Sequence, residues 1–446
     1  MENFEIIPPV DMSHPAATKP AKSEIEANAR SDKHIWGIYI MLCLISLIEL
    51  YSASSREVNV HGVLGVFGPL VRHVGLLVIG LGLMLYIQRV PYQKFEKPIW
   101  VLVIASIGMM LYVLFCGEIV NGARRSFNLM GITIQPSEFL KLSAALVIAL
   151  IMSKNHNKHT AGVYNRGVIM SAMIVAVFGG LLIKQGLTNT LLLMAISMSM
   201  MIVGGVEWRK LIVVGVVYAM LAGIFLLFGS GRESAPATVD GAPVVEATQT
   251  EGRHGTWYNR IMRHRGDGRP KYEYDINAEN RQEMYAYMAQ ANGGVFGVMP
   301  GNSRETARLP LAFSDYIYAI VIEDTGLVGG IVVLVLYLWL LARASSIASR
   351  CQRVFSALLV IGMAVMIVYQ ALFHMAIVSG LAPVSGQPLP LISKGGSSII
   401  VTSIAFGVML SVSRHAALNG AKRQEVKAEM ESLPENLRGE NPTMMQ

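Results

Sequence analysis

Residues 316–342 read YIYAIVIEDTGLVGGIVVLVLYLWLLA, and this stretch decides the class of fold. After two acidic residues, Glu323 and Asp324, it continues to residue 342 without a charged side chain. A helix of about 20 apolar residues is long enough to span the hydrocarbon core of a bilayer. The stretch therefore predicts a transmembrane helix with two carboxylates near its beginning.

Similar runs recur along the chain of 446 residues, which is 53% hydrophobic and only 15% charged. Soluble domains carry about 25% charged residues, so this composition excludes a soluble globular fold. The sequence predicts an all-α polytopic membrane protein with about ten transmembrane helices. The predicted segments are 35–53, 66–88, 98–116, 137–153, 167–184, 188–205, 210–229, 316–342, 355–379 and 397–413.

Lysine and arginine gather in alternate connections between these segments, a pattern that places those connections in the cytoplasm. We therefore expect both termini to be cytoplasmic. The expected division is a disordered tail over 1–34, a membrane domain over 35–415 and a second tail over 416–446. Because the basic residues lie in short segments between apolar runs, the net charge of +7 does not indicate a nucleic-acid partner.

Two predicted extracytoplasmic loops are basic, although the orientation rule disfavours positive charge there. One contains Arg124 and Arg125. The other, 230–310, is longer than the usual connection between elements, which indicates a functional or a disordered loop. Its basic stretch 253–271 is either an ordinary solvated loop or a surface that attracts an anionic substrate.

A first polar motif stands at the start of a predicted helix, in residues 135–150, QPSEFLKLSAALVIAL. Pro136 suits the first turn of a helix, and Ser137 is a residue type that caps one. Glu138 and Lys141 are three apart, so they lie on one helix face and are able to pair. Ionisable groups at membrane depth usually face a cavity or a partner. A structural ion pair that docks the helix to a neighbour is a compatible alternative.

A second motif spans residues 293–330, GGVFGVMPGNSRETARLPLAFSDYIYAIVIEDTGLVGG. Its glycines allow a tight backbone that approaches other groups closely. Asp315 lies in an apolar and aromatic run, and burial raises the pKa of a carboxylate and makes it a better proton acceptor. Asp315 is therefore a candidate general base. The alternative is a carboxylate that caps a helix.

A third motif lies between the last two predicted helices, in residues 379–403, SGLAPVSGQPLPLISKGGSSIIVTS. Irregular backbone at membrane depth occurs where protein or a water-filled cavity covers it. Lys394 precedes a helix amino end at Ser397 and Ser398. These residues suit an anion site, although such a sequence is more often a turn followed by a cap. The histidine of the ninth segment, His374, is better explained as a packed polar residue than as a metal ligand, and no His, Cys and carboxylate spacing predicts a metal site.

Together the three motifs resemble the SEDS family (shape, elongation, division and sporulation), which includes FtsW, RodA and SpoVE. The resemblance rests on GARRSF followed by QPSEFLK, on the 293–330 segment and on GLAPVSGQPLPLISKGGSS, and it covers roughly 35–415. The GNSR and PLPLIS elements are more similar to FtsW than to RodA. The sequence departs from the family pattern in several places. An acidic residue is missing from 186–190, position 126 is serine where tryptophan is usual, and Lys394 stands where aromatic residues are common. Ser314, Asp324 and His374 also replace the family's usual threonine, glutamate and asparagine.

The resemblance implies a peptidoglycan glycosyltransferase that polymerises lipid II on the outer face of the bacterial cytoplasmic membrane during cell division or elongation. It implies a class B penicillin-binding protein and other divisome membrane proteins as partners. Asp315 matches the family's essential aspartate, the pair Glu138 and Lys141 matches a conserved pair, and Arg124 falls on or next to its arginine.

Chemistry adds roles to these residues. A base must remove the proton of the acceptor hydroxyl, and cations must stabilise the departing pyrophosphate. The cations expected to do so are Arg124, Lys141, Arg304 and Lys394, with Glu323 and Ser397 in support. No cofactor is certain, and assistance by a divalent cation, Mg²⁺ or Mn²⁺, stays open. Two other functions stay open as well: a lipid II flippase and a non-catalytic divisome scaffold.

Overall fold

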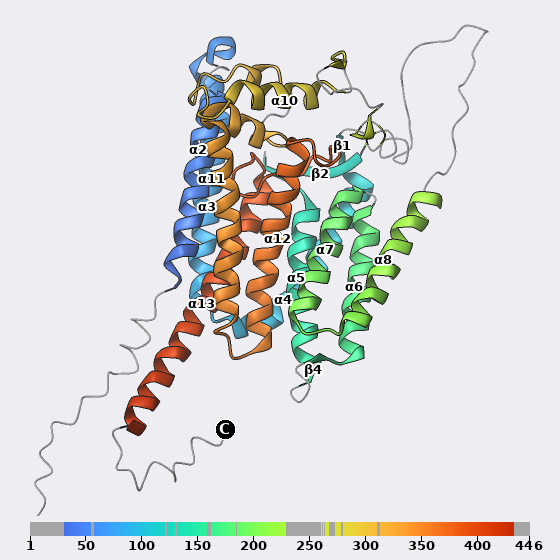
Figure 1. Cartoon of the computed structure of the whole chain (residues 1–446), viewed down its shortest axis with the longest axis vertical. Coiled ribbons are helices and arrows are strands. Elements are labelled where there is room, and N and C mark those ends of the chain that lie inside the picture. The colour runs from blue at the N-terminus through green and yellow to red at the C-terminus, as the bar shows by residue number, and fades with distance from the viewer. Residues whose placement is uncertain are drawn as a thin grey trace, which may run out of the picture.

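The computed structural model describes residues 31–54, 58–120, 123–129, 132–157, 162–183, 185–228, 260, 262, 264–266, 273–277, 280–309 and 313–431. Within these residues the chain is a bundle of long helices (Figure 1). Apolar helices occupy each of the predicted membrane segments. They are α2 (Lys33–Ser54), α3 (Val58–Arg89), α4 (Glu96–Cys116), α5 (Pro136–Lys154), α6 (Asn165–Ile183), α7 (Leu187–Val203), α8 (Trp208–Phe228), α11 (Ile317–Ala348), α12 (Val354–Val378) and α13 (Gly396–Glu431).

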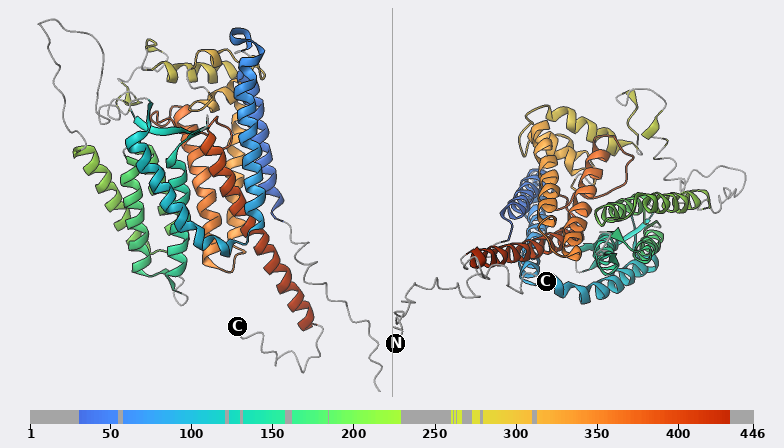
Figure 2. Two further views of the ribbon diagram at one scale, coloured as in Figure 1. Left: turned by 180° about the vertical axis from the view of Figure 1, so that it is seen from behind. Right: turned by 60° about the horizontal axis from the view of Figure 1, so that its bottom comes forward.

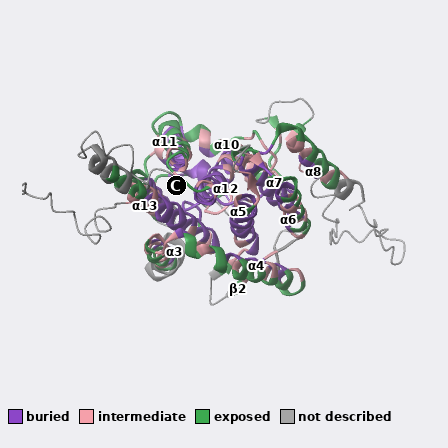
Figure 3. Ribbon diagram, turned by 90° about the horizontal axis from the view of Figure 1, so that it is seen from below, coloured by how far each residue is buried: buried purple, intermediate pink, exposed green. Residues whose placement is uncertain are grey.

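The helices differ in how deeply they are buried. Among the described residues, 8 helices are long and apolar enough to cross a membrane, and α7 is a shorter apolar helix of 17 residues. The apolar windows of α5, α12 and α13 are 89%, 83% and 83% buried inside the protein (Figure 3). Those of α3 and α4 are only 28% buried, so most of their side chains face outward. The centre of the bundle is therefore α5, α12 and α13.

The last helix continues beyond the predicted segment, which ends at residue 413. It extends to Glu431 and projects from the bundle, although its apolar span ends at Ala421 (Figures 1 and 2). The first part of the expected tail, 416–431, is thus a continuation of α13. The expected tail 1–34 and the stretch 230–252 lie almost wholly outside the described residues.

At one end of the bundle, a small antiparallel sheet replaces the irregular connection expected between α4 and α5. It consists of β1 (Glu118–Val120), β2 (Ala123–Leu129) and β3 (Ile132–Ile134). The register pairs Arg124 with Ile119 and Phe127 with Ile134. A second, two-stranded sheet of β4 (His156–Asn157) and β5 (Gly162–Val163) joins α5 to α6 at the opposite end.

The described part of the 230–310 loop contains a helix, α10 (Arg281–Gly293), and a 3-10 turn, η3 (Glu305–Ala307). Neither element was expected from the sequence. Helix α10 lies across the same end of the bundle as the β1–β2–β3 sheet (Figure 1).

Helix α11 is broken at Gly326, where φ is 75° and ψ is −177°. A β-carbon there would stand 2.2 Å from the carbonyl oxygen of Val295, so only glycine fits. The break frees backbone groups, and the glycine-rich loop pairs with them: Leu327 N–H donates to the carbonyl of Gly294 at 3.0 Å, and Val298 N–H donates to that of Glu323 at 2.9 Å. Because these groups are satisfied, an irregular segment is tolerated inside the bundle.

At the end of the bundle opposite α10, a polar contact joins α2, α11 and α13. Asp32 caps α2, because Oδ1 accepts N–H bonds from His34 (2.9 Å) and Ile35 (3.2 Å). Its other oxygen forms an ion pair with Arg343, and its own N–H donates to Ser413 Oγ at 3.1 Å.

Candidate functional site

Asp315 lies directly before α11, at the end of the bundle that carries the β1–β2–β3 sheet and α10. The segment between α12 and α13 passes beside its carboxylate. A β-carbon on Gly386, where φ is +68°, would stand 2.9 Å from Oδ2 of Asp315 and 3.5 Å from Nη1 of Arg125. Three regions far apart in the sequence therefore meet here: β2, the start of α11 and the 379–395 segment.

Two arginines face this carboxylate. Arg125, on β2, and Arg260, in the described part of the long loop, both interact electrostatically with Asp315. Burial raises the pKa of Asp315, while a hydrogen bond from the Ser314 side chain and the two guanidinium groups pull it back toward lower values. Asp315 is half-buried, and this partial burial favours its neutral form, yet it lies beside cations that favour its ionised form.

Two guanidinium groups lie close enough to affect each other as well as Asp315. Burial lowers the pKa of Arg125, and repulsion from Arg260 lowers it further. The Nε of Arg125 is buried and has no hydrogen-bond partner among the described residues. Arg260 is anchored by a bond from Nη1 to the carbonyl of Val384 at 3.1 Å. Two guanidinium groups beside a half-buried carboxylate are suited to bind an anionic group.

The 379–395 segment is held in place by polar side chains of the neighbouring helices. Two come from α12: His374 donates from Nδ1 to the Gln387 carbonyl at 2.6 Å, and Gln370 donates to the Pro388 carbonyl at 3.2 Å. Tyr337, on α11, donates to the Pro390 carbonyl at 2.5 Å. His374 is fully buried, in agreement with its interpretation as a packed polar residue.

The predicted pair of Glu138 and Lys141 forms. Lys141 Nζ lies 2.8 Å from Glu138 Oε1, and both side chains are buried. Lys141 also donates to Gln370 Oε1 at 2.8 Å, and Gln370 in turn holds Pro388. The pair therefore docks α5 to α12, which agrees with the prediction of a structural ion pair that holds this helix against a neighbour. It also connects α5 to the segment that contacts Asp315.

Helix α5 begins differently from the prediction. Gln135, not Ser137, is the N-cap residue, and no side chain makes a capping bond. Instead the N–H of Gln135 donates to Ser397 Oγ at the start of α13, at 3.1 Å. Ser397 thus connects the beginning of α5 to the beginning of α13.

Glu323 is fully buried and binds the loop before η3. Its oxygens accept bonds from Ser303 Oγ (2.5 Å), from the Arg304 N–H (2.8 Å) and from the Glu305 N–H (3.2 Å). Arg304 contributes its backbone here, while its side chain is exposed. The structure thus assigns Glu323 a role in shaping the loop.

Neighbouring Asp324 accepts a hydrogen bond from Ser52 of α2, and Ser52 Oγ also accepts the N–H of Gly301 at 2.7 Å. Together with the Glu323 contacts, these bonds fix the glycine-rich loop between α2 and α11.

Lys394 lies at the edge of this region. Its backbone N–H donates to the Phe313 carbonyl at 2.8 Å, and its Nζ stands 5.8 Å from the centre of the Phe313 ring. The side chain is exposed. Arg124 lies on β2 beside Arg125, but its side chain is outside the described part of the structure.

Several residues near Asp315 were not predicted from the sequence to belong to the site. Arg125 follows Arg124, the arginine that the sequence analysis assigned to the pyrophosphate. Arg260 was one of several basic residues in a long loop. Tyr316 is buried, and its hydroxyl has no partner among the described residues. Burial raises the pKa of Tyr316, as do Glu283, Asp315 and Tyr287 nearby, whereas Arg260 lowers it. Only the predicted outer-side position of Arg125, disfavoured by the orientation rule, was a usable signal.

The described side chains do not by themselves form a metal site. Among the described residues, no group of three or more His, Cys, Asp or Glu side chains is placed to hold a metal ion. Asp315 is a single carboxylate with two guanidinium groups beside it, and these repel a cation. No catalytic step is therefore assigned to a metal.

The fold and site define a polytopic helical membrane protein with a half-buried carboxylate and two arginines at one end of its bundle. The chain belongs to the FtsW/RodA/SpoVE family of cell cycle proteins, whose model matches residues 32–418.

Individual relatives agree with this membership. A probable peptidoglycan glycosyltransferase FtsW from Bacillus subtilis is 27% identical over 86% of this chain and 91% of that protein. The peptidoglycan glycosyltransferase MrdB from Escherichia coli K12 is 26% identical over 85% of this chain and 92% of that protein.

Two solved structures share the fold. A chain of a peptidoglycan synthase complex, studied for how it coordinates polymerisation and crosslinking, matches with a TM-score of 0.63 and 23% identity over 86% of this chain and 98% of that one. The rod shape determining protein RodA of Thermus thermophilus matches with a TM-score of 0.56 and 22% identity. The match covers 86% of this chain and 97% of that one.

Proposed function

We propose that this protein is a peptidoglycan glycosyltransferase that polymerises lipid II into glycan strands. Relatives that align over most of the chain carry that activity in their names. The observation that supports it most directly is the meeting of Asp315 with Arg125 and Arg260. A proton acceptor and an anion-binding pair within one shielded site are what transfer from a diphosphate donor requires.

In the proposed reaction, the 4-hydroxyl of the acceptor sugar attacks the anomeric carbon of the donor from the face opposite the diphosphate. The new carbon–oxygen bond is β, the bond to the α-linked diphosphate breaks, and the hydroxyl proton moves to Asp315. Undecaprenyl diphosphate leaves with the bonding electron pair. Asp315 must therefore be ionised before the attack, which the neighbouring guanidinium groups favour.

Arg125 and Arg260 are assigned to the departing diphosphate. Positive groups fixed in place stabilise developing charge most strongly where water is excluded. Arg260 is fixed through Val384, and Arg125 has an unpaired, buried Nε available to a phosphate oxygen. Lys394, exposed at the edge, is assigned to guide the anionic substrate inward. Lys141, buried and doubly bonded, is assigned to positioning the 379–395 segment.

The proposal includes orientation and partners. With the termini in the cytoplasm, Asp315 stands at the outer end of the bundle, where lipid II is polymerised. A class B penicillin-binding protein that cross-links the strands is the expected partner. Support comes from the likeness of fold to a chain of a complex that couples polymerisation to crosslinking.

The test is Asp315→Asn in the purified protein, reconstituted in nanodiscs with lipid II, with and without the transpeptidase. Loss of a general base costs about 10²–10⁴-fold in rate, so glycan product should nearly disappear. Asp275→Asn is the matched control, because Asp275 is an exposed aspartate of the same long loop.

The variant is also scored for co-purification of the partner, which should be unchanged. Normal glycan product from Asp315→Asn would remove this residue from the mechanism and favour a transport function instead.

A further inference from the structure

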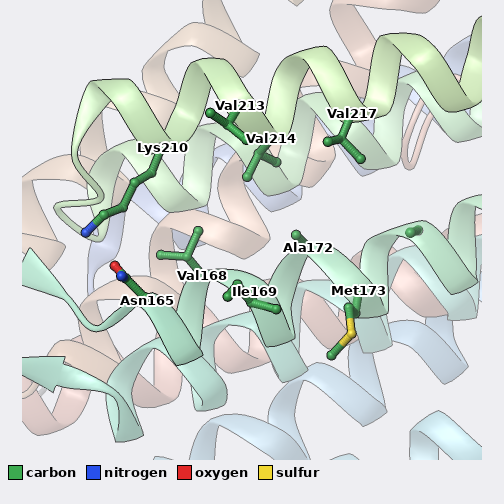
Figure 4. A pocket seen from close by; sticks show the side chains of 10 residues that line it. Asn165, Val168, Ile169, Ala172, Met173, Lys210, Val213, Val214 and Val217 are labelled. Carbon is green, nitrogen blue, oxygen red and sulfur yellow. The ribbon is translucent and has the colours of Figure 1, made fainter.

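Helices α6 and α8 enclose a groove at the edge of the bundle, on its outward surface. Its volume is about 390 Å³, and it is lined by apolar side chains except at one end (Figure 4). The polar end carries Lys210 of α8 and Asn165 of α6, which face each other across the groove. The rest of the lining is Val168, Ile169, Ala172, Met173, Ala176, Val213, Val214 and Val217.

We propose that this groove binds one anionic phospholipid, with an acyl chain along α6 and α8 and the phosphate at Lys210. The site is distinct from the Asp315 region, because α6 and α8 both begin at the opposite end of the bundle (Figure 1). The proposal does not depend on the catalytic function.

The length of the groove matches one leaflet. From Asn165 to Ala176 the lining of α6 extends roughly 16 Å, at about 1.5 Å per helical residue. Half of a hydrocarbon core of about 30 Å is nearly the same distance. A chain that starts at the level of Lys210 therefore reaches the middle of the bilayer where the groove ends.

The polar end has the composition of a membrane interface. Tyr164 and Trp208, which precede or start the two helices, are exposed aromatic residues of the kind that gather at headgroup level. Arg166 and Arg209 are also exposed at the beginnings of these helices, next in sequence to the lining residues Asn165 and Lys210. Basic pockets between transmembrane helices at a membrane face bind anionic lipid headgroups.

Lys210 is already paired with Glu207, at 3.1 Å, and this contact must be compatible with a lipid phosphate. The side chain of Glu207 is 68% exposed, so the pair is solvated and contributes little. Arg209 stands over the ring of Trp208, 5.9 Å from its centre, and Arg166 adds a further positive charge. The local charge therefore stays positive with Glu207 counted.

The volume favours an acyl chain over a partner helix. Pockets that hold small ligands enclose about 300–1,000 Å³, and this groove lies at the lower end of that range. A transmembrane helix is about 10 Å across with its side chains and would rest on the rim without filling the groove. Ile169 and Met173, both 57% exposed, are the side chains that a bound chain would cover.

Native mass spectrometry of the full-length protein tests the proposal. The protein is released from nanodiscs that contain equal amounts of phosphatidylglycerol and phosphatidylcholine, and the retained lipid is counted and identified. One phosphatidylglycerol per chain is the expected result. Ala172→Phe fills the groove and should abolish retention. Val177→Phe, which introduces the same bulky residue at an exposed position of the same helix outside the groove, should leave retention unchanged.

Charge is tested by Lys210→Gln. Removing one basic residue near an anionic lipid should weaken phosphatidylglycerol retention about fivefold, as one such residue contributes about 1 kcal/mol, and leave phosphatidylcholine unaffected. Lys97→Gln, an exposed lysine at the start of α4, is the control.

Three outcomes would overturn the proposal: equal retention of the two lipids, equal effects of the two phenylalanine variants, or an effect of Ala172→Phe on the Michaelis constant for lipid II without any on phospholipid. The last would assign the groove to the substrate's polyprenyl chain.

Discussion

Gly386 and Asp315 are so close that a β-carbon on Gly386 would stand 2.9 Å from Oδ2 of Asp315. The backbone of Gly386 also has a φ of +68°, a value that residues other than glycine rarely adopt. The proposed base therefore packs directly against the 379–395 segment, and the contact leaves no room for a methyl group on Gly386.

Gly386→Ala should therefore move the carboxylate away from its partners. A displacement of about 1 Å at a reacting group costs up to about 10²-fold in rate, so we expect a loss of glycan synthesis of that order, with normal membrane insertion. Gly82→Ala is the control, because no atom lies within 4 Å of the added β-carbon. Equal activities of the two variants would show that Gly386 does not position Asp315.

The pH dependence of polymerisation should report on Arg125. The carboxylate must be ionised to act, so the rate should fall as pH decreases through the pKa of Asp315, which burial holds above its ordinary value. Arg125 opposes that rise. Arg125→Gln should therefore raise the pKa of Asp315 and move the acid limb of the pH–rate profile to higher pH.

The same variant should lower the maximal rate about 10²–10³-fold, if Arg125 also stabilises the departing diphosphate. Arg350→Gln, which changes an exposed arginine just after α11, should alter neither quantity. A lower rate with an unmoved acid limb would separate Arg125 from the ionisation of Asp315.

The buried ion pair should behave as a unit. Lys141→Met leaves Glu138 as an unpaired buried charge, and breaking such a pair costs about 3–5 kcal/mol. We expect a marked loss of thermal stability in detergent. Glu138→Gln combined with Lys141→Met should restore much of it, because no unpaired charge remains. Lys97→Met provides an exposed control, and a double variant as unstable as the single one would contradict the interpretation.

The ion pair of Asp32 and Arg343 should stabilise the opposite end of the bundle. Asp32→Asn removes a charged cap of α2 and the bond to Arg343, which together should cost about 1–2 kcal/mol in unfolding free energy. Glu207→Gln, in an exposed pair, should cost little. The measurement is the melting temperature of each purified variant.

The effect should depend on pH with a definite sign. Burial raises the pKa of Asp32, but the bond and charge of Arg343 and the N–H groups of Ile35 and His34 bring it below its usual 3.8. Its contribution is therefore complete above about pH 4 and lost as pH falls through the lower, folded value. The difference in melting temperature between wild type and Asp32→Asn should shrink over that range, and a constant difference would contradict the assignment.

Much of the site was predictable because its residues are costly in a membrane. Asp315, Glu138 and Lys141 stood out as ionisable groups at the edges of apolar runs, and the spacing of three in the last two predicted their pairing. Arg125 and Arg260 could not be singled out. A basic residue in a loop has the same local sequence signal whether it is solvated or folded back over a site.

The sequence by itself determined the membrane class, the positions of the apolar helices and the chemical character of the proposed base, because hydrophobic length and isolated charge are local properties. Only the tertiary structure decided that α5, α12 and α13 form the centre, since the mean hydropathies of buried and outward-facing helices overlap, at 2.2 for α12 and 2.0 for α3. It also decided that Gly386, Arg125 and Arg260 surround Asp315. Those contacts join residues more than fifty positions apart, and only the packing of the bundle brings them together.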